Sequence, residues 1–155
     1  MATLSVTHTE AITLNDREQG GTKTYTVASI AQVLKRTVTC PASVDTTIAT
    51  FQTATSTSDS ALDLESTKYI RVTNLDSSNS VNLSLQVAGA EGGTANMSTT
   101  ILLGAGETFT MGVPHDGIAL SDASAGIVTA LTDLESILID PSGNAVAVEV
   151  FIASV

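Results

Sequence analysis

Basic residues and aromatic residues are both scarce in this chain of 155 residues. Six Lys and Arg stand against 16 Asp and Glu, which gives a net charge of −10. A nucleic-acid-binding protein needs the opposite sign to neutralise phosphates, so we expect no nucleic-acid partner. Aromatic residues make up 3% of the chain and Trp is absent. This composition argues against a platform on which sugars or bases stack.

Cysteine and long apolar segments are also lacking. The single cysteine, Cys40, excludes an intrachain disulfide, and we expect it to pack as a small hydrophobic side chain near a strand end. The apolar runs are too short to span a bilayer, and the N-terminal segment has neither the basic nor the apolar region of a signal peptide. We therefore expect no membrane partner, and a protein that stays in the cytoplasm or assembles there into a larger particle.

The few basic residues are distributed unevenly. All six lie in the first 71 positions, and from Val72 onward there are nine acidic residues and no Lys or Arg. This asymmetry has two interpretations. It can be an ordinary solvated acidic surface, or it can mark a polarised body whose basic side docks onto an acidic partner.

What the chain has in abundance is alternation of apolar and polar residues. Residues 81–87 alternate strictly, and residues 69–73 show the same period of two, which is typical of strands with one buried face. Residues 76–80, Asp-Ser-Ser-Asn-Ser, favour a turn because these side chains bond their own backbone. We predict a β-hairpin over residues 68–88.

A second hairpin is predicted at the C-terminal end. Residues 136–139 lead into the turn sequence Asp-Pro-Ser-Gly-Asn, and alternation resumes over residues 146–152. Phe151 lies on the parity opposite to the valines, so both faces of this last strand carry apolar residues. Turn chemistry explains the Asp140 segment, which lacks the alternating oxygen ligands of a calcium loop.

The remaining segments add short strands and polar connections. We predict strands at 3–14 (with Glu10 as a possible bulge), 23–27, 36–40, 46–52, 99–103 and 107–111, a bend at 29–35, polar loops at 15–21, 53–60 and 89–93, a short strand around Ile118 and one helical turn over 127–134. About ten short strands with almost no helix predict an all-β fold, a single antiparallel β-sandwich of the jelly-roll kind. Residues 1–155 show no composition break, so one domain is expected.

Chemistry is hard to find in this pattern. His8 falls on the apolar parity of the first strand, which favours a structural role, and no spacing typical of metal ligands is present. His115 and Asp116 could form a triad with a serine, but adjacent residues seldom reach that geometry and no nucleophile turn is present. We predict no catalytic, cofactor-binding or metal-binding residues and no cofactor, and we expect that the protein is not an enzyme.

Four stretches resemble small structural proteins from the virions of tailed, aquatic bacteriophages. They are the opening Met-Ala-Thr-Leu-Ser-Val-Thr-His-Thr-Glu-Ala-Ile-Thr-Leu-Asn, residues 68–76, residues 102–109, and the C-terminal Val-Glu-Val-Phe-Ile-Ala-Ser. The resemblance implies a virion protein, and within that class we favour a capsid decoration (cement) protein. Such proteins fold first and then bind the outside of an assembled shell, commonly as trimers at threefold positions.

This resemblance implies partners and surfaces that the residues themselves do not define. The major capsid protein or other virion proteins are the expected partners, with a homotrimer favoured. The basic side would dock through Lys35, Arg36, Lys68 and Arg71, and Phe151 would mediate self-association. Two alternatives remain open: a tail, fibre or adaptor component, and a host-surface module that binds a receptor or glycan. The second alternative needs a pocket with exposed aromatic rings.

Overall fold

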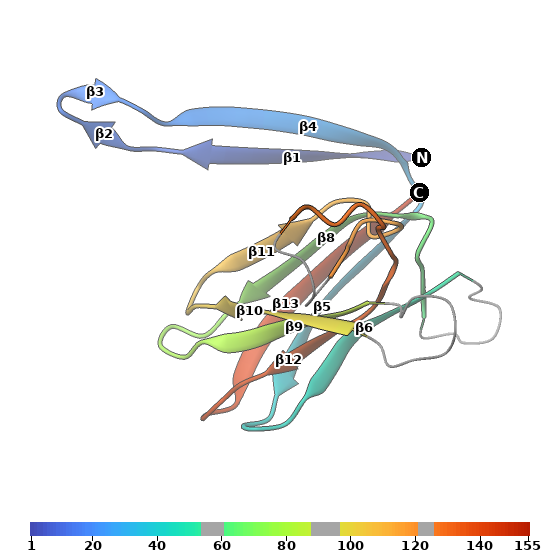
Figure 1. Ribbon diagram of the computed structural model, residues 1–155. Coiled ribbons are helices and arrows are strands. Elements are labelled where there is room, and N and C mark those ends of the chain that lie inside the picture. The colour runs from blue at the N-terminus through green and yellow to red at the C-terminus, as the bar shows by residue number, and fades with distance from the viewer. Residues whose placement is uncertain (54–60, 88–96, 121–125) are drawn as a thin grey trace.

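The computed structural model describes residues 1–53, 61–87, 97–120 and 126–155, and its regular structure is all-β. Thirteen strands in these residues form two facing antiparallel sheets and a separate hairpin (Figure 1). This confirms the predicted all-β sandwich, while jelly-roll connectivity stays a prediction. The polar loops predicted at 53–60 and 89–93 lie almost entirely outside the described residues.

The two sheets of the sandwich are built from strands that are distant in sequence. The first sheet has the order β10 (Met97–Leu103), β9 (Val81–Val87), β12 (Leu134–Asp140), β6 (Thr46–Gln52) and β7 (Leu62–Asp63). The second has the order β11 (Thr108–Met111), β8 (Thr67–Asn74), β13 (Val146–Ser154) and β5 (Gln32–Cys40). Neighbouring strands are antiparallel except for the parallel pair of β6 and β7.

The core lies between these sheets and follows the alternation seen in the sequence. On β9 the alternate residues Val81, Leu83, Leu85 and Val87 are buried. The facing sheet likewise buries alternate apolar residues of its strands, among them Ile70, Val72, Val148, Val150 and Ile152. Burying each such side chain stabilises the fold by roughly 1.5–3 kcal/mol. Cys40, at the end of β5, is fully buried in this core, as predicted, and burial raises the pKa of its thiol.

Both predicted hairpins are wrong, although their strands are correct. β8 and β9 belong to opposite sheets, so the segment between them crosses the sandwich as an arch instead of closing a hairpin. The Asp76 carboxylate accepts the backbone N–H groups of Ser78 and Asn79 at 2.8 and 2.7 Å, which shapes the arch. β12 and β13 are likewise split between the two sheets. Alternation defines which side of a strand is buried but not which strand lies beside it.

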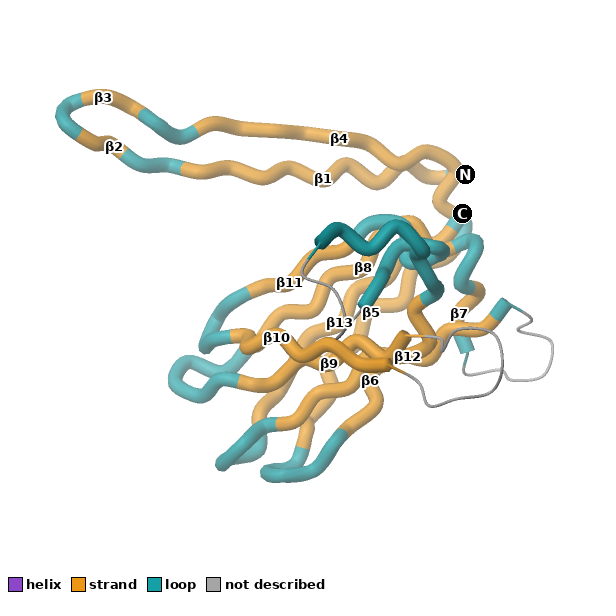
Figure 2. The backbone as a smooth tube through the Cα atoms, in the orientation of Figure 1, coloured by secondary structure: helices purple, strands orange, loops and turns teal. Residues whose placement is uncertain are grey.

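The hairpin that does form is the N-terminal one. β1 (Ala2–Glu10) pairs antiparallel with β4 (Gly21–Ile30), and the short strands β2 (Thr13–Leu14) and β3 (Arg17–Glu18) close its end. We call residues 2–30 the arm. Figure 2 shows the arm as a separate hairpin that runs above the sandwich, with its tip beyond the edge of the sandwich and both chain termini near its base. The predicted strand over 3–14 is therefore interrupted after Glu10, and the predicted loop at 15–21 includes a strand.

The arm joins the sandwich through a sharp bend. Ser29 has a φ of 63°, and Ala31 is the one residue between β4 and β5. The Ala31 N–H donates to the Ser154 carbonyl at 2.9 Å and so fixes the bend against β13. A bend does join two strands within the predicted segment 29–35, but most of that segment is strand, since β4 ends at Ile30 and β5 begins at Gln32.

The predicted helical turn over 127–134 is wrong. Ile127 is 94% exposed, and Leu134 is instead the first residue of β12. Ile118, predicted in a short strand, makes an isolated β-bridge with Thr132. In the described ranges no helix is long and apolar enough to cross a membrane.

Candidate functional site

Among the described residues, the apolar packing of the arm on the sandwich lies near its base. Val6 and Ile30 of the arm pack with Tyr69 and Ala153, and Phe151 borders this small apolar cluster, which we call the base cluster. The rings of Tyr69 and Phe151 meet edge to face, with centroids 6.0 Å apart. The base cluster is separate from the main core, so the arm is attached at one end.

The two faces of the arm differ in chemistry. One face carries pairs of threonines, and the hydroxyl oxygens of Thr7 and Thr24 lie 2.9 Å apart. The other face continues the parity of Val6 with His8, whose ring stacks on that of Tyr25 at a centroid distance of 6.2 Å. His8 is exposed in this position. It is a strand histidine, as predicted, but it does not lie in the core.

The conformation of the arm's tip is fixed by local contacts. Asn15 and Asp16 have φ values of 52° and 60°, which match the turn type that suits a two-residue hairpin. The Glu18 carboxylate accepts the backbone N–H groups of Gly20 at 2.7 Å and Ile12 at 3.2 Å. The bond from Gly20, followed by that from Ile12, lowers the pKa of Glu18. The tip therefore has a defined local conformation.

Apolar side chains are exposed on this tip. Ile12 is 56% exposed and Leu14 is 59% exposed. β1 and β4 pair only with each other among the described strands, so the outer edge of each carries unpaired backbone groups. An isolated two-stranded hairpin is marginal in water. The arm is therefore the part of the described chain that most needs a partner.

Two of the four predicted docking residues lie together. The Lys35 ammonium is 3.2 Å from Oε2 of Glu149, and the Arg71 guanidinium binds the other oxygen, Oε1, of the same carboxylate. The hydrogen bond from Lys35 is the largest cause that lowers the pKa of Glu149, and the charges of Lys35 and Arg71 add to it. Lys35, Arg71 and Glu149 form what we call the charged patch, with one more cation than anion. It lies on strands β5, β8 and β13.

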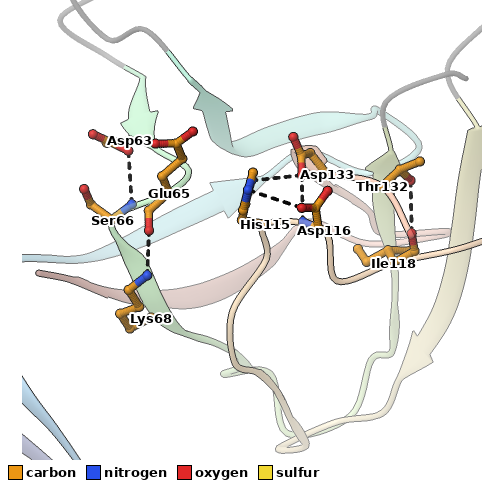
Figure 3. A network of polar contacts seen from close by, with 9 residues as sticks. All are labelled: Asp63, Glu65, Ser66, Lys68, His115, Asp116, Ile118, Thr132 and Asp133. Atoms are coloured by element: carbon orange, nitrogen blue, oxygen red, sulfur yellow. Dashed lines mark hydrogen bonds and ion pairs between the residues drawn. The ribbon is translucent and has the colours of Figure 1, made fainter. Parts of the chain in front are cut away.

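The other two predicted docking residues are used within the chain. Arg36 follows Lys35 on β5 and so points to the opposite face, where its guanidinium donates to the Ile48 carbonyl of the other sheet. Lys68 donates to the Glu65 carbonyl at 2.6 Å, as drawn in Figure 3. The predicted docking surface contained four basic residues, and of these the structure brings together Lys35 and Arg71.

Phe151 lies on the face of β13 opposite to the buried valines, in agreement with its parity. Its ring contacts Tyr69 and lies 5.7 Å below the Arg71 guanidinium, at the border of the base cluster. The residue is half-buried by these contacts within the chain. Self-association through Phe151 stays a prediction.

A cluster of ionisable side chains surrounds His115. Nδ1 of His115 lies 3.1 Å from Oδ1 of Asp133, and Nε2 lies 3.4 Å from Oδ2 of Asp116 (Figure 3). Asp133 lies 17 residues after Asp116 in the sequence, and the Ile118–Thr132 bridge aligns the two segments. Its Oδ1 also accepts the Asp116 N–H at 2.7 Å. Sequence reasoning missed Asp133, since no spacing signal connects it to His115.

The chemistry open to the His115 cluster is limited by its geometry. One ligand atom from each of the three residues lies within 4.8 Å of the others, yet the two ring nitrogens face different carboxylates. Nδ1 is shielded from solvent and lacks an aligned hydrogen-bond partner. A closed zinc site uses four ligands, one more than this cluster supplies in the part of the chain described. Within the same part, the hydrogen bonds of the cluster include no hydroxyl that could act as a nucleophile.

A shallow polar hollow of about 260 Å³ lies on the outer face of the first sheet. Most of its lining residues carry amide, hydroxyl or carboxylate groups; they are Asp45, Asn82, Ser84, Gln86, Ser98, Thr100, Leu138 and Asp140. These groups can hydrogen-bond a polyhydroxyl ligand, but no aromatic ring lines the hollow.

In comparisons with protein-family models, with curated proteins and with solved structures, the chain matches none.

Proposed function

We propose that this chain is a non-enzymatic structural protein of a bacteriophage virion. In this role it binds the outside of an assembled capsid, which it decorates and stabilises. The class follows from the resemblance of the four stretches described above, and the major capsid protein is the expected partner. The protein acts as a homo-oligomer, and a trimer would suit a threefold position on the shell.

The observation that carries this proposal is the arm. It is an extension with exposed apolar residues at its tip, and in the described residues it is held on the sandwich by the base cluster and by the bend at Ala31. A free monomer gains nothing from holding Ile12 and Leu14 in water, whereas a subunit of a larger assembly can bury them. The geometry therefore favours a subunit of an assembly over a protein that works alone.

The charged patch supports docking onto an acidic surface. The chain has a net charge of −10, so long-range repulsion from most acidic partners is expected. Lys35 is 59% exposed and lies beside Arg71 on the outer face of the second sheet. These two cations give the body one face on which an acidic capsid surface can approach.

Co-sedimentation with assembled empty capsids tests the proposal. We expect saturable binding of the full chain, and weaker binding by the Lys35→Glu variant, because the substitution reverses the sign of the most exposed cation of the charged patch. The matched control is Lys23→Glu on the arm, which makes the same charge change outside the patch. Wild-type protein that stays in the supernatant with capsids would overturn the proposal, and equal binding by both variants would exclude the charged patch.

A tail, fibre or adaptor component is the alternative within the virion. The arm would serve such a component equally well, since ring-forming subunits also join through extended elements. The same sedimentation assay with isolated tails separates the two places, because binding to tails and not to capsids would favour this alternative.

The polar hollow favours a second candidate function, binding of a host-surface glycan. Asn82, Gln86 and Asp140 could hydrogen-bond sugar hydroxyls. The rings available to stack on a sugar lie elsewhere, so we rank this function below the structural one. A glycan array gives the test: binding that Gln86→Ala abolishes would promote the glycan function, and an array without hits would remove it.

A further inference from the structure

The tip of the arm presents a small, preorganised apolar surface. Ile12 and Leu14 are held by the turn at Asn15 and by the bonds to Glu18, and both remain more than half exposed. Because the backbone of this surface is already ordered, less conformational entropy is lost when the surface binds a partner.

A complementary apolar groove lies on the open side of the sandwich, where strand β5 of one sheet faces β7 of the other. Its volume is about 410 Å³ and its lining is mostly apolar, from Gln32, Val33, Leu34, Leu62, Ile152 and Ser154. Val33 at its rim is 54% exposed. β5 is an edge strand that pairs with β13 on one side only among the described strands, so its outer edge can accept another strand.

The tip of the arm cannot reach the groove of its own chain. The arm passes into β5 through Ala31, so the groove begins next to the base of the arm. β4 has 10 residues, and at about 3.3 Å per residue the tip lies roughly 30 Å away. Figure 1 shows this separation, with β2 and β3 at the end of the arm farthest from β5.

The charges of the two surfaces are complementary. Between Glu10 and Glu18 the arm carries three acidic residues and one basic residue. On β5, Lys35 is 59% exposed, and Lys35 and Arg71 together outnumber the one carboxylate they share, that of Glu149. Asp63 follows Leu62 on the other wall of the groove. In a chain with ten more acidic than basic residues, β5 is one of the few segments that an acidic tip would approach favourably.

We propose that the tip of the arm of one copy docks into the groove of a second copy. Ile12 and Leu14 lie against Val33 and Leu62, and the acidic side chains of the tip lie near Lys35. The contact joins two different surfaces, so it is heterologous and generates a closed ring when the rotation between copies allows. This inference concerns the binding of the chain to itself and holds whether or not the chain binds a capsid.

A directed cross-link tests the contact. Leu14→Cys protein is mixed with Val33→Cys protein under oxidised glutathione, and we expect an intermolecular disulfide between the two chains. Cys40 is fully buried and does not compete in the folded protein. The control replaces Val33→Cys with Val44→Cys, because Val44 is similarly exposed, at 50%, but lies outside the groove. A mixture that cross-links no faster than this control overturns the proposal.

The oligomeric state gives an independent test. Sedimentation of the full chain over a dilution series should show a discrete oligomer, and the double variant Ile12→Ser, Leu14→Ser should associate at least about tenfold more weakly, since each lost apolar contact is worth about a factor of ten or more. Ile127→Ser removes an equally apolar side chain, 94% exposed, away from both surfaces and should leave the oligomer unchanged. A wild-type monomer at all concentrations, or an oligomer that survives the double variant, overturns the proposal.

These measurements use no capsid, so they fail or succeed separately from the sedimentation assay under "Proposed function". Circular dichroism of each variant should match the wild type, because all substituted positions are exposed.

Discussion

The Glu18 carboxylate lies 2.7 Å from the backbone nitrogen of Gly20, two residues further along the arm. The same carboxylate accepts the Ile12 N–H from the opposite strand, so one side chain fastens both sides of the tip. Glu18→Ala removes this acceptor while leaving the sandwich intact. We expect faster hydrogen exchange at the Ile12 and Gly20 amides, with the unfolding temperature unchanged.

The control for this prediction is Glu10→Ala, which removes a nearby exposed carboxylate. Exchange at the tip should stay as slow as in the wild type. If Glu18→Ala and Glu10→Ala gave the same exchange rates, the side chain of Glu18 would not be holding the tip.

The adjacent glycines Gly20 and Gly21 of the arm differ in how much space a side chain would have. A Cβ atom at Gly20 would lie 2.0 Å from the Glu10 carbonyl oxygen, whereas one at Gly21 would have nothing within 4 Å. We expect Gly20→Ala to break the pairing of Glu10 with Gly21 and to shift the amide resonances of the arm. Gly21→Ala should leave them in place. Equal chemical-shift changes in both variants would contradict the described geometry.

The arch between β8 and β9 depends on the fully buried side chain of Asn74. Its amide nitrogen donates to the carbonyls of Asn79 at 2.8 Å and Gly104 at 2.9 Å, and its oxygen accepts the Asp76 N–H at 3.0 Å. Asn74→Ala leaves these partly buried groups without their partner, which should lower the free energy of unfolding by about 1–3 kcal/mol.

Urea unfolding measures this loss, with Asn82→Ala as the matched control on the outer face of β9. The control should change the unfolding midpoint little. A midpoint for Asn74→Ala that equals the wild type would mean that solvent replaces the lost bonds.

The acid side of the stability profile should depend on Asp76. Hydrogen bonds from the Asn79 and Ser78 amides hold the pKa of its carboxyl below the ordinary value of 3.8. A folded-state pKa below the unfolded one means that the stabilisation is present above the unfolded pKa and is lost as pH falls through the folded pKa. The contribution of Asp76 to the melting temperature should therefore be present and independent of pH near neutrality, and it should be lost as the pH falls below about 4.

Asp76→Asn should flatten this acid decline, because an amide does not titrate. Thermal unfolding followed from pH 7 to pH 2 gives the comparison. Parallel curves for the wild type and the variant would show that other carboxyl groups, such as that of Glu149, control the acid limb.

The arm illustrates what pattern reasoning can and cannot find. Its two strands were predicted from alternation, and Asn15-Asp16 between them tolerates the positive φ values that a tight hairpin needs. That signal could have identified the hairpin. Its projection into solvent could not be predicted, because Val6 and Ile30 have the same apolar character whether they enter the main core or the separate base cluster.

The candidate surfaces were predictable only in part. Adjacent positions on a strand point to opposite faces, so Lys35 and Arg36 could have been assigned different roles from sequence. The meeting of Lys35 with Arg71 across Glu149 depends on the neighbours of β13, and the meeting of His115 with Asp133 depends on one β-bridge. These are long-range pairings that leave no mark in local composition.

The sequence by itself determined the all-β class, most of the strands and the side of each strand that is buried, because a period of two is a local property that burial on one face requires. It also determined that Phe151 opposes the valines of its strand. Only the tertiary structure decided that β8 and β9, and likewise β12 and β13, lie in different sheets and that the first hairpin projects as an arm. Backbone hydrogen bonds between two strands are the same whichever strands pair. The packing of the whole core therefore decides which strands lie side by side.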